Sequence, residues 1–81
     1  MKGKILVVED DEDLQNMYAE ILESNEYQIE TASDGEEGVE KFKTFDPKLV
    51  IMDSDMPKLN GYNATLKIKE IDSKATVVLI T

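Results

Sequence analysis

Residues 4–8, Lys-Ile-Leu-Val-Val, form a short apolar run that is followed at once by three acids, Glu9-Asp10-Asp11. A run of this length, rich in β-branched residues and bounded by charge, is typical of a strand buried on both faces of a sheet. The pattern returns in residues 49–55, Leu-Val-Ile-Met-Asp-Ser-Asp, where an uninterrupted apolar run again ends in acids. The sequence therefore predicts two interior strands whose carboxyl ends both carry carboxylates.

Helical periods separate these strands. After the first strand, apolar residues recur at the i, i+3, i+4, i+7 and i+8 spacing of an amphipathic helix, at Leu14, Met17, Tyr18, Ile21 and Leu22. Asp10 or Asp11 can cap the start of this helix, and Ser24-Asn25 ends it. The other predicted elements are a strand at 27–32, a helix opened by Glu36-Glu37 and stopped by Asp46-Pro47, a helix with its apolar face at Tyr62, Thr65, Ile68 and Ile71, and a strand at 75–80.

The resulting order is βαβαβαβ. Alternation at this spacing favours the α/β class, with a doubly wound parallel sheet, helices on both faces and right-handed crossovers. The 81 residues allow one domain. A fourth strand at the end of this order would be an exposed edge, although residues 77–80 are apolar on both faces.

Composition narrows the chemistry. The chain has no cysteine and no histidine, which excludes disulfides, thiolate metal sites and histidine-based acid catalysis. Its apolar runs are far shorter than the ~20 residues of a membrane span, and no secretory signal opens the chain, so we expect a cytoplasmic protein. The net charge of −9 repels nucleic acids and anionic membranes and attracts divalent cations and basic partners.

The acids at the strand ends suggest a specific chemistry. In open α/β sheets, ligands bind beyond the carboxyl ends of the strands. If the first and third strands are neighbours, four or five carboxyl groups converge there, raise one another's pKa values and favour Mg²⁺. A carboxylate such as Asp53 beside the metal can attack phosphorus and form an aspartyl-phosphate. Taken singly, each acid also fits a solvated helix start, a turn or a loop.

Three segments in order resemble the receiver domain of bacterial response regulators. They are residues 5–11, Ile-Leu-Val-Val-Glu-Asp-Asp; residues 49–57, Leu-Val-Ile-Met-Asp-Ser-Asp-Met-Pro, followed by Gly61; and residues 77–81, Val-Val-Leu-Ile-Thr. Asp53 to Gly61 fits the family's D-x-x-M-P-x-x-x-G pattern without a gap, and the likeness runs over the whole chain. The resemblance implies a flavodoxin-like fold.

The resemblance also implies a role for each matching position. Asp53 corresponds to the phosphoacceptor. Glu9, Asp10, Asp53 and, through its backbone carbonyl, Asp55 correspond to the residues that hold Mg²⁺ or Mn²⁺. Thr81 corresponds to the hydroxyl that binds the phosphate and switches the domain, while Pro57 and Gly61 shape the loop after the phosphoacceptor. The implied function is a Mg-dependent acceptor of a phosphoryl group from a histidine kinase or phosphotransfer protein, which switches an output domain or partner and catalyses at most its own phosphorylation and dephosphorylation.

The chain departs from the family at its end. A receiver continues through a further helix, a fifth strand with a phosphate-pairing lysine, and a last helix, and Lys58 does not match that lysine. Residues 1–81 are therefore expected to be an incomplete receiver domain, truncated before the fifth strand. We expect it to self-associate through the fourth strand or to be complemented by a fragment, and to accept phosphate poorly because a terminal carboxylate at Thr81 would repel the phosphoryl group.

Other functions fit parts of the pattern. Asp53-Ser54-Asp55 fits the D-x-D of haloacid-dehalogenase phosphatases, although that motif follows a first strand and continues differently. A topoisomerase–primase type of nucleic-acid enzyme also pairs a glutamate with D-x-D, but the charge of −9 argues against it. An inert structural fragment with solvated acids is the third alternative. A phosphatase would turn over phosphate esters, a receiver would hold one labile phosphoryl group, and an inert fragment would do neither.

Overall fold

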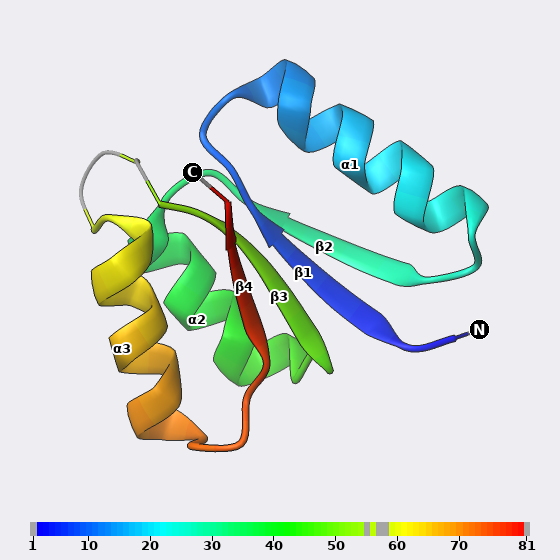
Figure 1. The fold of residues 1–81 in the computed structure, drawn as a ribbon. Helices are drawn as coiled ribbons and strands as arrows, with labels where there is room; N and C mark the ends of the chain where they lie inside the picture. The colour runs from blue at the N-terminus through cyan, green and yellow to red at the C-terminus, as the bar shows by residue number, and fades with distance from the viewer. Residues whose placement is uncertain (1, 55, 57–58, 81) are drawn as a thin grey trace.

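The computed structural model describes residues 2–80 except 55 and 57–58. Within this part of the chain, four parallel strands alternate with three helices (Figure 1). The elements are β1 (Lys4–Val8), α1 (Glu12–Ser24), β2 (Gln28–Ala32), α2 (Gly35–Phe45), β3 (Leu49–Asp53), α3 (Gly61–Ile71) and β4 (Val77–Ile80). The strand order is β2-β1-β3-β4, and every pair is parallel, so the predicted doubly wound α/β fold is confirmed.

The helices form two layers around the sheet. Helix α1 lies over one face, and α2 and α3 lie over the other (Figure 1). The central strands β1 and β3 carry the most deeply buried side chains, among them Leu6, Val50 and Met52, which are fully buried against α2 and α3. This burial explains the uninterrupted apolar run of β1, because Ile5 to Val8 are all buried. In β3, Val50 and Met52 are buried, whereas Leu49 and Ile51 on the other face are half-buried.

Helix α1 begins where one of the two predicted caps places it. The Asp11 carboxylate accepts hydrogen bonds from the backbone N–H groups of Asp13 and Leu14 at 2.9 and 3.2 Å, so Asp11 is the N-cap. The apolar stripe predicted to face the core is only partly covered, because Met17 and Ile21 are 45% and 52% exposed. The reason is the position of α1, which contacts β1 and β2 but not β3 or β4 within the described residues.

Helix α3 buries a different face from the predicted one. Gly61, Ala64 and Ile68 are buried, whereas Tyr62 and Ile71 are exposed. Of the predicted apolar face, Ile68 alone is therefore in the core. The small residues at 61 and 64 let the backbone of α3 approach β3 closely, and a pattern of large apolar residues does not register this kind of contact.

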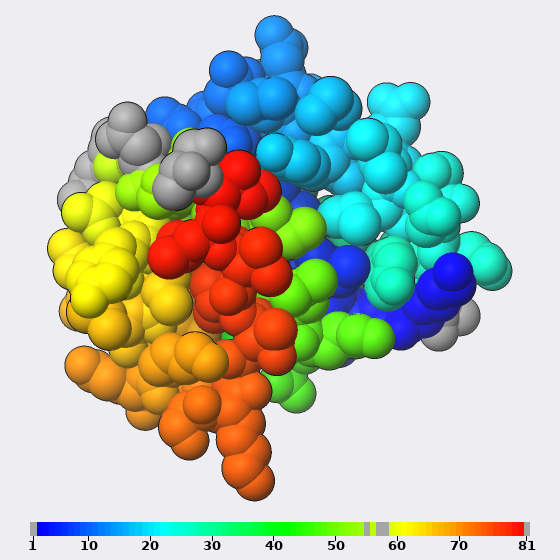
Figure 2. All heavy atoms as spheres, in the orientation of Figure 1, coloured from blue at the N-terminus to red at the C-terminus, as the bar shows by residue number. Residues whose placement is uncertain are grey.

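Strand β4 forms one edge of the sheet. It lies at the surface between α3 and the α1 side of the molecule, as Figure 2 shows. Val78 is 48% exposed and Leu79 is 40% exposed, and these two neighbours point to opposite faces of the sheet. The predicted exposed edge is thus present. Among the described residues, no helix has the length and apolar character needed to cross a membrane.

Candidate functional site

The candidate site lies at the carboxyl ends of β1 and β3. These strands are adjacent, and Val8 pairs with Met52 as the last matched pair. The residues that follow, Glu9 and Asp53, therefore lie at the same level: Glu9 comes directly after β1, and Asp53 is the last residue of β3. Because neighbouring parallel strands lie ~4.8 Å apart, side chains at this level can meet beyond the carboxyl ends of the two strands.

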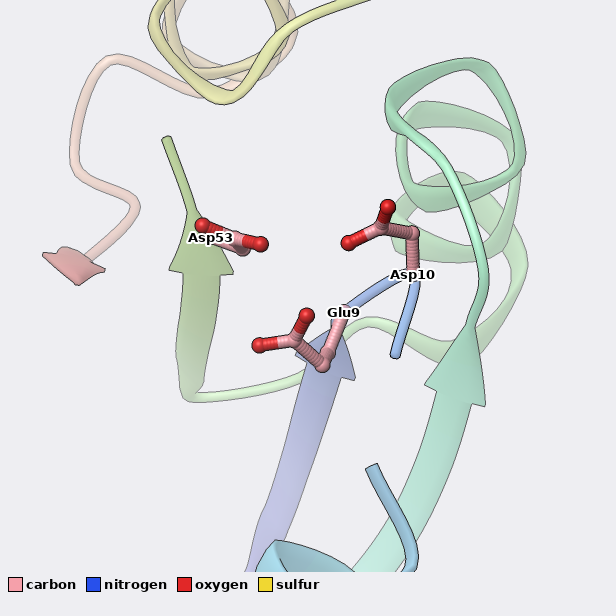
Figure 3. Close-up of side chains that lie close together, drawn as sticks. All are labelled: Glu9, Asp10 and Asp53. Carbon is pink, nitrogen blue, oxygen red and sulfur yellow. The ribbon is translucent and has the colours of Figure 1, made fainter. Parts of the chain in front are cut away.

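Three of the predicted acids come together there. One carboxylate oxygen from each of Glu9, Asp10 and Asp53 lies within 4.8 Å of the other two. Glu9 is buried, Asp53 is half-buried and Asp10 is exposed, so the cluster runs from the protein interior to solvent. Figure 3 shows the three side chains converging, with Glu9 and Asp10 coming from the segment after β1 and Asp53 from the end of β3.

The other predicted site residues divide into two groups. Gly61 lies within the described residues and packs against the backbone of Asp53. Asp55, Pro57 and Thr81 lie outside the described residues, so their predicted roles stay predictions. Lys58 does not correspond to the phosphate-pairing lysine of the family, and it also lies outside the described residues.

Glu9 is the most strongly perturbed acid of the cluster. Its side chain is only 5% exposed. Burial raises the pKa of Glu9 from 4.5 to about 7, and the hydrogen bond with Asp53 and the charge of that residue add to the rise. The backbone N–H of Asp11, which donates to the Glu9 carboxylate at 3.1 Å, opposes it. Near neutral pH, a proton therefore relieves part of the repulsion within the cluster.

This shift predicts a pH-dependent stability without metal. Because the folded-state pKa of Glu9 is about 7 and the unfolded value is 4.5, its contribution is fully present below pH 4.5 and is lost as the pH rises through 7. Relative to Glu9→Gln, the wild type should lose about 1 to 3 kcal/mol of unfolding free energy over this range. Urea titrations from pH 4.5 to 7.5 measure this difference.

A surface glutamate provides the control for that experiment. Glu20 lies on the exposed side of α1, and Glu20→Gln makes the same chemical change away from the cluster. We expect the pH profile of Glu20→Gln to run parallel to that of the wild type. If the Glu9→Gln profile does so as well, the pKa of Glu9 is not raised in the folded protein.

A residue that the sequence analysis did not single out holds the site from the α1 side. The Gln15 side-chain amide donates hydrogen bonds to the carbonyl oxygens of Glu9 and Ala32, both at 3.0 Å. It thereby ties the ends of β1 and β2 to the first turn of α1. A polar residue next to the apolar face of α1 is the feature of the sequence that could have drawn attention to Gln15. The spacing of residues in α1 does not reveal which groups accept the hydrogen bonds of Gln15.

The loop after β3 is closed at its neck by Gly61. The Gly61 N–H donates to the Ser54 carbonyl at 3.2 Å. A Cβ atom on Gly61 would lie 2.0 Å from the carbonyl oxygen of Asp53 and 2.7 Å from Cα of Ser54, so only glycine fits there. The backbone of Asp53 is thus packed directly against the start of α3. Met56, within the loop, is 7% exposed and belongs to the hydrophobic core.

Comparison with known proteins identifies the family. Residues 5–81 match the model of the response regulator receiver domain, so the chain belongs to this family of two-component signalling domains. The chemotaxis protein CheY of Halobacterium salinarum is 41% identical over 81 residues, which cover all of this chain and 68% of that protein. The predicted resemblance is confirmed.

Solved structures agree with this assignment. The N-terminal domain of a response regulator receiver protein from Methanoculleus marisnigri superposes with a TM-score of 0.93 at 29% identity, over all of this chain and 68% of that one. The response regulator TrrA of Thermotoga maritima, in complex with Mg(2+)-BeF, gives a TM-score of 0.90 at 34% identity, over 94% of this chain and 66% of that one. The flavodoxin-like fold is confirmed, and the chain spans about two thirds of the length of these relatives.

Proposed function

We propose that this receiver domain accepts a phosphoryl group on Asp53 in a reaction that depends on a divalent cation. The observation that carries the proposal is the convergence of Glu9, Asp10 and Asp53 within 4.8 Å at the ends of two adjacent strands. Membership of the receiver family supports the proposal. The position of the cluster supports it as well, because ligands bind at this end of the sheet in doubly wound folds.

The acid cluster fits Mg²⁺. Its donors are all carboxylate oxygens, the hard ligands that Mg²⁺ prefers, and the exposure of Asp10 leaves one side open to the waters that Mg²⁺ retains. Glu9, Asp10 and Asp53 would hold the ion, with the backbone carbonyl of Asp55 as a further proposed ligand. When bound, the cation neutralises charge on the transferring phosphoryl group. Mn²⁺ has similar ligand preferences and is proposed as a substitute.

The residues of the chain define the proposed step. A carboxylate oxygen of Asp53 forms a bond to phosphorus while the bond from phosphorus to the donor's leaving atom breaks, and the leaving group takes up a proton. Asp53 is half-buried and therefore partly accessible to an incoming donor. We propose that the Thr81 hydroxyl then binds the phosphoryl oxygens, and that Pro57 and Gly61 hold the loop in place.

The proposed partners follow from this chemistry. The donor is a histidine kinase or a phosphotransfer protein, and the domain itself is not an enzyme beyond its own phosphorylation and dephosphorylation. Family membership supports this proposal and a cytoplasmic location for the exchange, since receiver domains act in two-component signalling. We further propose that residues 1–81 are an incomplete receiver and that the exposed edge at β4 is a surface for self-association or for complementation by a fragment.

Titration with Mg²⁺ tests the metal site. Mg²⁺ should raise the melting temperature of the wild type by mass action. At a free Mg²⁺ concentration one hundred times the dissociation constant, the free energy of unfolding should rise by about 2.7 kcal/mol. Asp10→Ala should lose most of this response, because it removes the solvent-facing ligand. Asp13→Ala, an exposed acid of the same charge in the first turn of α1, should keep it. An equal response in Asp10→Ala and the wild type would exclude Asp10 from the site.

A further inference from the structure

The loop between Asp53 and α3 is held at a second point, far along the sequence from its neck. Gly35, the first residue of α2, is buried against Leu59 of this loop. A Cβ atom on Gly35 would lie 1.9 Å from the Leu59 carbonyl oxygen, 2.8 Å from its carbonyl carbon and 3.0 Å from its Cβ. Real Cβ atoms essentially never approach backbone atoms this closely, so Gly35 and Leu59 make a contact that only glycine permits.

The start of α2 is itself firmly placed. Asp34 caps the helix, with its carboxylate accepting a hydrogen bond from the Glu37 N–H at 2.8 Å. One turn later, Gly38 packs against the side chain of Val8, at the end of β1. The first turn of α2 is therefore fixed to the central sheet, and it presents a rigid surface to Leu59.

These contacts anchor the described part of the loop at three places. Gly61 holds the neck against Asp53 and Ser54, Met56 is buried in the core, and Leu59 rests on Gly35. A side chain at position 35 has no room unless the Leu59 backbone moves. Leu59 is two residues from Gly61, which is hydrogen-bonded to Ser54 and packed against Asp53, so we expect a displacement at Leu59 to shift the backbone beside Asp53.

From this arrangement we infer that Gly35 is a positioning residue for the acid cluster: by admitting the Leu59 carbonyl, it fixes Leu59 and the start of α3 at Gly61, and thereby the backbone of Asp53 and the geometry of cation binding. The inference rests on the proposed cation site at Asp53. It assigns a part in that site to a residue of a different helix, which carries no functional group of its own. Outer contacts that orient metal ligands typically contribute about tenfold to a hundredfold in affinity.

Gly35→Ala tests this inference. Mg²⁺ binding is measured by calorimetry or NMR titration, and we expect Gly35→Ala to raise the dissociation constant about tenfold or more. Gly38→Ala is the matched control, because it makes the same change in the same helix but meets only the side-chain atoms of Val8, at 2.9 and 3.1 Å. Phe42→Leu, in the core part of α2, controls for loss of stability alone. Both controls should stay within about twofold of the wild type.

Hydrogen exchange provides a reading that needs no metal. The Gly61 amide hydrogen, bonded to the Ser54 carbonyl, should exchange faster in Gly35→Ala than in Gly38→Ala when both are compared at equal global stability. If Gly35→Ala does not fold, Leu59→Gly replaces it, because this change removes the packing of the Leu59 side chain without creating a steric clash. Leu59→Gly should likewise weaken Mg²⁺ binding and speed exchange at Gly61.

The outcomes separate the inference from the proposed function. A wild type that binds no Mg²⁺ overturns the proposed cation site, and exchange at Gly61 then decides whether Gly35 positions the loop. A wild type that binds Mg²⁺, together with Gly35→Ala of unchanged affinity and exchange, overturns the inference alone. An equal loss in Gly35→Ala and Gly38→Ala also overturns it, because crowding anywhere in α2 would then suffice.

Discussion

Asp53→Asn should reduce phosphorylation of this chain by a small phosphodonor by about a hundredfold or more. An amide oxygen is a far weaker nucleophile than a carboxylate, and no other described carboxylate offers the same combination of position at a strand end and partial exposure, since Glu9 is buried. The measurement is incubation with acetyl phosphate and Mg²⁺, followed by intact mass and by the stability of the product in base. An acyl phosphate on Asp53 is lost in base, whereas a phosphate on a hydroxyl survives.

Two aspartate variants control this experiment. Asp13→Asn makes the same change at an exposed position of α1 and should leave phosphorylation unchanged. Asp10→Asn keeps the acceptor but removes a proposed cation ligand, so phosphorylation should become slow while the phosphoryl group still maps to residue 53. Phosphorylation that persists in Asp53→Asn, or that maps to a hydroxyl in the wild type, would refute the assignment.

Local patterns were sufficient to predict the order of elements and the position of the acids. The apolar run of β1 is unbroken because both of its faces are buried, whereas β3 is buried on one face and half-buried on the other. The cap at Asp11 and the stop at Asp46-Pro47 depend only on neighbouring residues. The sequence leaves the adjacency of β1 and β3 as a condition, and the structure shows that the two strands pair, which brings Glu9 beside Asp53. Each of these features is encoded within a few residues or in the topology.

Features that depend on long-range contacts were not predictable in this way. The hydrogen bonds of Gln15 reach Ala32, and the contact of Gly35 reaches Leu59, so neither is visible in a local pattern. The extent to which α1 and α3 bury their apolar residues is hidden for a related reason. Spacing shows that a helix has an apolar face, but the degree of burial depends on which neighbouring elements cover it, as the exposure of Met17 and Tyr62 shows.

The edge of the sheet at β4 leads to the remaining prediction, which concerns self-association. The carbonyl oxygens of Thr76 and Ile80 accept hydrogen bonds from the N–H groups of Val50 in β3 and of Ser54 directly after it, at 2.9 and 3.0 Å. Because alternate residues of a strand direct their backbone groups to opposite sides, those of Val77 and Leu79 face away from β3. An edge with outward backbone groups and exposed apolar side chains is a template for pairing with another strand. Two copies related by a twofold axis would pair their β4 strands antiparallel.

Sedimentation at several concentrations measures this association. We expect the wild type, with a mass of 9.1 kDa, to shift toward twice that mass as concentration rises, and more so at high salt, because salt screens the repulsion between two chains of charge −9. Leu79→Pro removes the outward N–H and should keep the protein monomeric, since proline is tolerated at an edge where that N–H faces solvent. Leu79→Ala removes more of the side chain than Leu79→Pro does but keeps the N–H, so it should still associate, though more weakly than the wild type. A wild type that remains monomeric throughout, or a Leu79→Pro variant that associates as strongly as the wild type, would show that β4 does not pair in this way.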